Sequence, residues 1–171
     1  MAANVDTRSS YLLFIPLLLI ALIVDIVRLP EFIAPFRPDF PALLLIFFAV
    51  YDPRRIGIVL AWCCGLLVDL LMGAPLGQNA LCIALQIYLI MTQFKRFGLF
   101  AKWQQMIVIL IINMLGHVLG YWISHIAGNV NYNDNLFYPS IITALLWPAV
   151  FYAGIFMCKA MNIAPDLPKE N

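Results

Sequence analysis

Long apolar stretches separated by short polar segments dominate the chain. Six can be drawn, at roughly residues 11–27, 39–51, 56–72, 78–94, 103–127 and 137–158. The apolar core of a bilayer is ~30 Å thick and needs ~20 helical residues, with ~17 tolerated. Five of the stretches reach that length, and the polar segments between them are too short for a soluble domain. The pattern therefore predicts a bundle of membrane-spanning helices.

The second stretch, 39–51, is shorter than the others. Its 13 residues would span only ~20 Å as a helix. It is either a short span with local thinning of the bilayer or a re-entrant segment. Pro41 near its start and the Asp52-Pro53 pair at its end are typical of helix termini. We therefore favour six spans over five.

Composition supports a membrane protein. Of 171 residues, 64% are apolar and 11% are charged, and the mean hydropathy is +0.92, whereas soluble domains are about half apolar and a quarter charged. We expect one integral membrane domain, 1–171. The first stretch is interpreted as an uncleaved span, because only Arg8 precedes it and Pro30 and Glu31 follow where a cleavage site needs small residues.

The lysines and arginines predict the orientation, because cytoplasmic loops carry an excess of them. With six spans and a cytoplasmic N-terminus, the outside carries two, Arg28 and Arg37. The inside then carries eight: Arg8, Arg54, Arg55, Lys95, Arg96, Lys102, Lys159 and Lys169. A five-span arrangement with an outer N-terminus fits equally well. Both place the C-terminus in the cytoplasm.

Acidic residues within apolar stretches are costly in lipid and are candidates for function. Asp25 and Asp69 are the two cases, both near the outer ends of their stretches, with Arg28 one helical turn after Asp25. One interpretation is a set of ion pairs at the outer surface, shared with Arg37 and Asp39. A sharper one pairs Asp69 with Arg37. A proton relay is less favoured, because both acids lie near water.

His117 lies near the middle of the 103–127 stretch. No third ligand accompanies it and His125, so we expect a neutral imidazole bonded to a neighbouring helix and no metal. Gly116 and Gly120 are spaced as a small-xxx-small motif, which permits close helix packing. With Asn113 and Ser124 they form a polar seam, which we interpret as the binding face for a partner helix.

A proline interrupts the last apolar stretch, and the chain lacks the common catalytic motifs. Trp147-Pro148 predicts a kink in the last helix. The cysteines are interpreted as small apolar side chains; they are Cys63, Cys64, Cys82 and Cys158. No phosphate-binding loop, HExxH motif or serine elbow occurs, and no basic run suggests nucleic acid. The sequence thus predicts no catalytic residue, cofactor or metal site.

Four short strings in register resemble the rod shape-determining protein MreD family. They are RPDF at 37–40, GLLVDLLMG at 65–73 with LGQ at 76–78, WQQ at 103–105 and LWP at 146–148. The resemblance covers residues 10–160. It implies a non-enzymatic inner-membrane component of the machinery that builds the lateral cell wall of rod-shaped bacteria. It also implies a six-helix fold similar to the substrate-binding subunits of energy-coupling-factor transporters.

The same resemblance implies partners. MreC, a protein with one span, would be the direct partner, with indirect links to the MreB filament and the RodA–penicillin-binding-protein synthase. The residues around Arg37, Asp39, Asp69 and Gln78 would hold the fold or meet the membrane-proximal part of that partner. The small-residue face of 103–127 and the kinked last helix would receive its span. Self-association is left open.

Two alternatives remain beside the scaffold. A small-molecule-binding or transport protein should have a polar site at the bilayer midplane, where this chain offers only Gln86, Asn113 and His117. A membrane enzyme acting on lipid would need an acid–base set, and none is evident.

Overall fold

A computed structural model describes residues 10–27, 30, 36–94, 97–128 and 137–163. Within these ranges the chain forms six α-helices and one short 3₁₀ helix, with no strand. The elements are α1 (Tyr11–Ile26), α2 (Phe40–Tyr51), α3 (Ile58–Met72), α4 (Gln78–Thr92), η2 (Phe97–Leu99), α5 (Lys102–Ile126) and α6 (Phe137–Ala160). The prediction of an all-α bundle is confirmed.

Each α-helix begins and ends within two residues of its expected stretch. Two of them, α5 and α6, are long and apolar enough to cross a membrane by themselves. The other four are shorter apolar helices of 12 to 16 residues. That each of the four crosses a bilayer stays a prediction.

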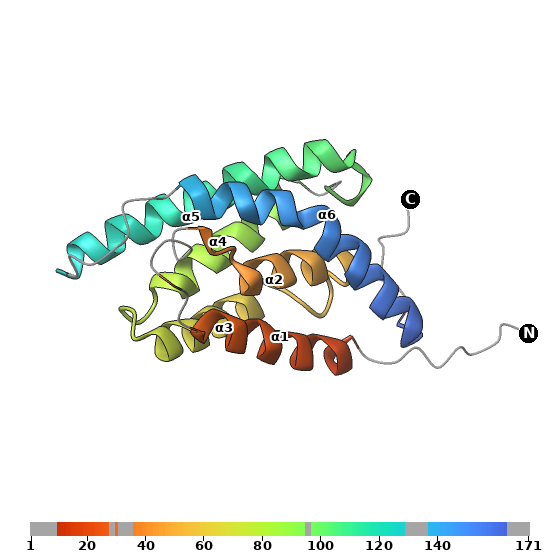
Figure 1. The fold of residues 1–171 in the computed structure, drawn as a ribbon, viewed down its shortest axis with the longest axis horizontal. Helices are drawn as coiled ribbons and strands as arrows, with labels where there is room; N and C mark the ends of the chain where they lie inside the picture. Colours follow the sequence, from red (N-terminus) through yellow and green to blue (C-terminus); the bar gives the residue numbers. More distant parts are fainter. Residues whose placement is uncertain (1–9, 28–29, 31–35, 95–96, 129–136, 164–171) are drawn as a thin grey trace, which may run out of the picture.

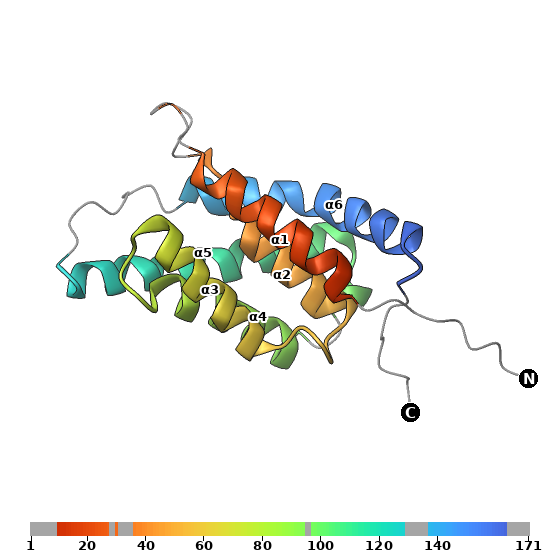
Figure 2. The ribbon, with the colours of Figure 1, turned by 90° about the horizontal axis from the view of Figure 1, so that it is seen from below.

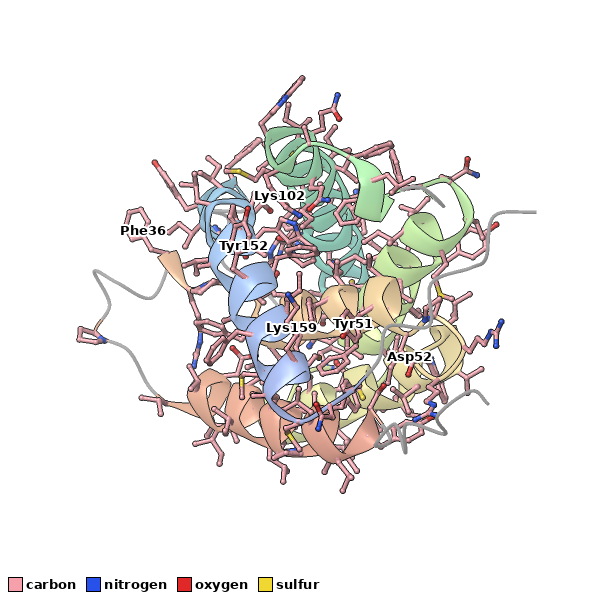
Figure 3. All side chains as sticks on the ribbon, turned by 90° about the vertical axis from the view of Figure 1, so that its right-hand side faces the viewer. Phe36, Tyr51, Asp52, Lys102, Tyr152 and Lys159 are labelled. Atoms are coloured by element: carbon pink, nitrogen blue, oxygen red, sulfur yellow. The ribbon has the colours of Figure 1, made fainter. Side chains whose placement is uncertain are left out.

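Successive helices run in alternating directions, so the bundle has two ends (Figures 1 and 2). We call the end with Lys102 and Lys159 the lysine end, and Figure 3 views the molecule from it. The opposite end, where α1 and α3 finish and α4 begins, carries Arg37 and is called the Arg37 end. The main packed pairs are α3 with α4, α5 with α6, α4 with α5, and α2 with α1, α4 and α6.

The short helix α2 lies in the centre of this bundle. Nine consecutive residues, 41–49, are buried, so protein surrounds it on every side. Its 12 residues make it only ~18 Å long. Because its neighbours rather than lipid cover it, α2 does not have to match the bilayer thickness. This accounts for the short second stretch in the sequence.

The outer helices divide into an inward and an outward face, both apolar. On α1, Phe14, Leu18 and Leu22 are buried, at helical spacing. Leu19 and Ile23 on the opposite face are more than half exposed. Leucine or isoleucine facing outward suits a lipid environment, where exposure of apolar surface carries no cost.

The contact between α3 and α4 is unusually close. A Cβ added at Gly65 would overlap the backbone of Asn79 and Ala80. Only glycine therefore lets the start of α4 lie directly against α3. The same face of α3 carries Asp69 one turn later, so this approach brings the Asp69 carboxylate to the first turn of α4.

Candidate functional site: polar contacts between the helices

Asp69 binds the N-terminus of α4. It is completely buried, and its carboxylate accepts hydrogen bonds from the backbone N–H groups of Asn79 at 2.8 Å, Gly77 at 2.9 Å and Ala80 at 3.4 Å. The first N–H groups of a helix lack partners within the helix and carry a partial positive charge. They compensate the buried carboxylate. The loop reaches this position through Gly73 and Gly77, whose positive φ angles of 66° and 96° suit glycine.

The expected pairing of Asp69 with Arg37 is wrong. Arg37 instead binds the end of α1, where its Nη2 donates to the carbonyl oxygens of Val24 at 2.6 Å and Val27 at 3.0 Å. Its Nε lies 3.4 Å from the Asp25 carboxylate. A cation at the C-terminus of a helix is favourable. Asp69 needs no cation because backbone donors already satisfy it. Arg28, the other expected partner of Asp25, lies outside the described residues.

Asp39 joins α2 to both long helices. Its carboxylate Oδ2 accepts a hydrogen bond from Nδ2 of Asn113 on α5 at 2.8 Å, and its backbone N–H donates to the Thr143 hydroxyl on α6 at 3.0 Å. Nε2 of His117 lies 3.0 Å from the same Oδ2, without the alignment of a hydrogen bond. Asn113 and Thr143 are completely buried. These contacts hold the first residues of α2 at mid-height of α5.

The small-residue face of α5 packs within the chain. Gly116 and Gly120 are buried, and a Cβ at Gly116 would overlap the side-chain amide of Gln86 on α4. Farther along the same seam, the Ser124 hydroxyl donates to Oε1 of Gln78, the first residue of α4, at 2.8 Å. The interpretation of this seam as a face for a partner helix is therefore wrong, because α4 already occupies it.

Gln105 organises the lysine end. It is completely buried, and its Nε2 donates to the carbonyl oxygens of Phe97 and Phe100, each at 3.0 Å. Its Oε1 accepts from Nε1 of Trp147 on α6 at 2.8 Å and from Nζ of Lys102 at 3.2 Å. The indole of Trp147 is fully buried. Two of the motif strings, WQQ and LWP, therefore meet through a hydrogen bond.

Two further joints at this end were not expected from the sequence. The Ser10 hydroxyl donates to Asp52 at 2.5 Å, which ties the start of α1 to the end of α2. The Tyr51 hydroxyl donates to the carbonyl of Ile163 at 2.9 Å. Gln105 could have been selected because it belongs to a motif string, whereas Ser10 and Asp52 sit at the edges of apolar stretches and carry no such signal.

Metal and disulfide chemistry find little support in the described part of the chain. No group of three or more His, Cys, Asp or Glu side chains is placed to hold a metal ion there. The four cysteines are free, with Cys64, Cys82 and Cys158 buried and Cys63 exposed. The clustered polar side chains serve mainly to hold one helix to the next.

Comparison with known proteins agrees with this picture. The family model described as "rod shape-determining protein MreD" matches residues 7–155. A protein of Haemophilus influenzae named rod shape-determining protein MreD is 21% identical over 132 residues, which are 77% of this chain and 82% of that protein. No solved structure matches, so similarity to energy-coupling-factor transporter subunits stays a prediction.

The family match spans most of the chain and includes all four motif strings. The residues in those strings make interhelical joints, with Arg37 at the end of α1, Asp69 at the start of α4, and Gln105 against Trp147. The chain belongs to the rod shape-determining protein MreD family.

Proposed function

We propose that this chain is a non-enzymatic scaffold subunit of the rod-shape complex in the bacterial inner membrane. In this role it binds an MreC-like protein through its membrane-spanning part and so supports lateral peptidoglycan synthesis. MreB filaments and the RodA–penicillin-binding-protein synthase are linked to it indirectly. The family's role in rod shape determination is the starting point, and the specific partner and the scaffold mechanism are our inference.

One observation carries the proposal. Most of the buried polar side chains in the described helices are bonded to another helix or loop of the same chain, as Asp69, Gln78 and Gln105 are. The helices consequently present mainly apolar outer faces. A protein of this kind acts through contacts between helices in the bilayer, which depend on close packing and shape.

The outer face of α6 is where we place the partner's span. Four of its exposed apolar side chains form this face. They recur at intervals of four, seven and four residues on one side of the helix, and they are Ile141, Leu145, Tyr152 and Phe156. Pro148 lies between the two pairs inside α6, and the helix changes direction partway along (Figure 1). This face replaces the seam on α5, which α4 covers.

We also propose an orientation in the membrane, with the lysine end in the cytoplasm. With the lysine end in the cytoplasm, Arg54, Arg55, Lys102 and Lys159 face inward, as the positive-inside rule requires. Since α2 runs antiparallel to α1 between the two ends (Figure 2), six spans place both termini in the cytoplasm.

Site-specific photo-crosslinking in living rod-shaped cells tests the partner face. A photoreactive amino acid replaces Leu145 on α6 or, as a matched control, Leu70 on α3. Both side chains are at least 60% exposed in this chain. We expect a crosslink to a single-span protein of the MreC type from position 145 and none from position 70. Equal capture at both positions, or none at either, would contradict the proposed face.

A functional readout separates assembly from catalysis. Leu145→Trp should leave the amount of protein in the membrane unchanged, reduce recovery of the partner on purification, and give rounded cells. Turnover of a lipid or peptidoglycan precursor by the chain purified alone would overturn the non-enzymatic assignment.

A further inference from the structure

A polar cavity opens beside the first turn of α2. Its volume is about 180 Å³, and α2, α3, α4 and α5 enclose it with the residues at the Arg37 end. The polar side chains in its wall include Asp25, Arg37, Asp39, Gln86 and His117. Ala42, Val68 and Ile83 give it an apolar side.

The short length of α2 explains why the cavity exists. Asp39 precedes α2 and contacts Asn113, the twelfth of the 25 residues of α5. From there α5 continues for 13 more residues, or ~20 Å, toward the Arg37 end. The space past the beginning of α2 is therefore bounded by longer neighbours, and the helices leave it unfilled.

Gln86 offers this space a hydrogen-bond acceptor that has no partner. Its side chain is nine-tenths buried, at 4% exposure, and its Oε1 has no hydrogen-bond partner. A buried amide oxygen without a partner destabilises the fold. The glycine at position 116 leaves room for the amide group there, because a Cβ would overlap its Nε2.

The charges in the wall do not cancel. Arg37 is committed to Asp25 and to the end of α1. Asp39 receives one hydrogen bond, from the neutral amide of Asn113, and about a third of its side chain is accessible. Nε2 of His117 lies 3.0 Å from Oδ2 of Asp39, so it carries a proton and is no acceptor there. With a neutral imidazole, two carboxylates and one guanidinium leave the wall with one net negative charge.

We propose that this cavity binds a primary ammonium group. An ammonium carries three N–H donors in a compact cation, which match the Asp39 carboxylate and the Gln86 oxygen. The apolar side accepts a short alkyl stem. A metal ion fits less well, since no metal-binding group of three acidic, His or Cys side chains exists among the described residues.

The size of the cavity limits the ligand to a small amine. A volume of 180 Å³ corresponds to about six water molecules at ~30 Å³ each. Two sources provide such a group on the outer side of a membrane: a free alkylamine, and the ethanolamine headgroup of a phospholipid. Binding of an ammonium group in this cavity is independent of the partner span placed on α6.

Ethanolamine hydrochloride is the probe for the free amine, with choline chloride as the control because a quaternary ammonium has no N–H group. Both are added at equal ionic strength to the full chain purified in detergent. We expect ethanolamine to raise the melting temperature with a saturable dependence on concentration, and choline to leave it unchanged. An equal response to both salts would overturn the proposal.

Isosteric variants test the residues assigned to binding. Asp39→Asn and Gln86→Leu should each weaken the apparent ethanolamine affinity about tenfold or more, as expected for loss of a charged or buried hydrogen bond. The matched control is Asp52→Asn, since Asp52 is a buried acid that lies at the lysine end. Should all three variants bind ethanolamine like the native chain, the ammonium does not occupy this cavity.

Cys82 lines the cavity. Its reactivity therefore reports whether the cavity is occupied, without any change to the polar wall. In a chain with Cys63, Cys64 and Cys158 changed to serine, ethanolamine should slow alkylation of Cys82 by a small maleimide. Lipid discs of phosphatidylethanolamine and phosphatidylcholine, without free amine, distinguish the second source. Protection of Cys82 by either the free amine or the phosphatidylethanolamine disc supports the site. Protection by neither overturns the proposal, and His117 alone then compensates the Asp39 carboxylate.

Discussion

At the scale of single residues, the polar side chains within the apolar stretches mainly join helices. Asp69 illustrates the physics, because its charge is compensated by three backbone N–H groups of the next helix. The buried acid and the helix N-terminus satisfy each other. This arrangement needs no basic residue, which is why the Asp69–Arg37 pair does not form, whereas Arg37 pairs with Asp25.

Replacing Asp69 should therefore destabilise the whole bundle. Asp69→Ala leaves three backbone donors at the start of α4 without their acceptor, and we expect a loss of about 3 kcal/mol or more in the free energy of unfolding. Asp69→Asn keeps one acceptor oxygen and should lose less. Titration with sodium dodecyl sulfate, followed by circular dichroism, measures both. The control Leu70→Ala changes a neighbour that is 66% exposed, and a loss as large as that of Asp69→Ala would contradict this account.

Gly65 makes a complementary prediction, since it sets the distance between α3 and α4. The added methyl group of Gly65→Ala meets the backbone of Ala80, which cannot move as a flexible side chain can. The helices must separate, at a cost of about 1–3 kcal/mol. Gly57→Ala is the matched control, because nothing lies within 4 Å of its Cβ position. Equal melting temperatures for the two variants would show that the contact is not limiting.

At the scale of elements, the central position of α2 is the main finding. Ordinary outer helices of the bundle have an inward and a lipid-facing side, whereas α2 is buried all round. Its two ends are fixed by polar contacts, through Asp39 to Asn113 and through Asp52 to Ser10. The α5–α6 pair is similarly fixed at the lysine end by Gln105 and Trp147.

Adjacent positions on α2 should consequently be equally sensitive to truncation. Leu45 and Ile46 point to different sides of the helix, yet both are fully buried, so Leu45→Ala and Ile46→Ala should each cost about 2–5 kcal/mol. On α1, truncating the buried Leu18 should be similarly costly, but Ile23→Ala, at a position 61% exposed, should be nearly neutral. If truncation to alanine on one side of α2 left the free energy of unfolding unchanged, lipid would reach that side.

At the scale of the whole molecule, the bundle has one end with lysines and one with Arg37 and the polar cavity. This unequal distribution of lysine residues matters because the more basic end is expected to face the cytoplasm. The lysine end carries Lys102 and Lys159 (Figure 3). The cavity at the other end would then be open to the outer side of the membrane.

Cysteine labelling in intact cells tests this orientation. In a background where the native cysteines are serine, Leu76→Cys lies in the turn between α3 and α4, at a position 72% exposed. A membrane-impermeant maleimide should label it in spheroplasts. Arg54→Cys, at the lysine end, should be labelled only after the membrane is permeabilised. The reverse pattern would invert the topology, and labelling of both without permeabilisation would contradict a membrane-spanning bundle.

The number, type and approximate bounds of the helices followed from the sequence. The length of each apolar stretch, and the proline or glycine residues at its ends, are local signals. They determine where a helix begins and ends, whatever that helix packs against. The central place of α2, the partner of Asp69 and the inward rotation of Gly116 and Gly120 came only from the tertiary structure. In a soluble helix the polar face marks the outside. Here both the lipid-facing and the protein-facing residues are apolar, so only the packing of neighbours determines which way each helix is turned.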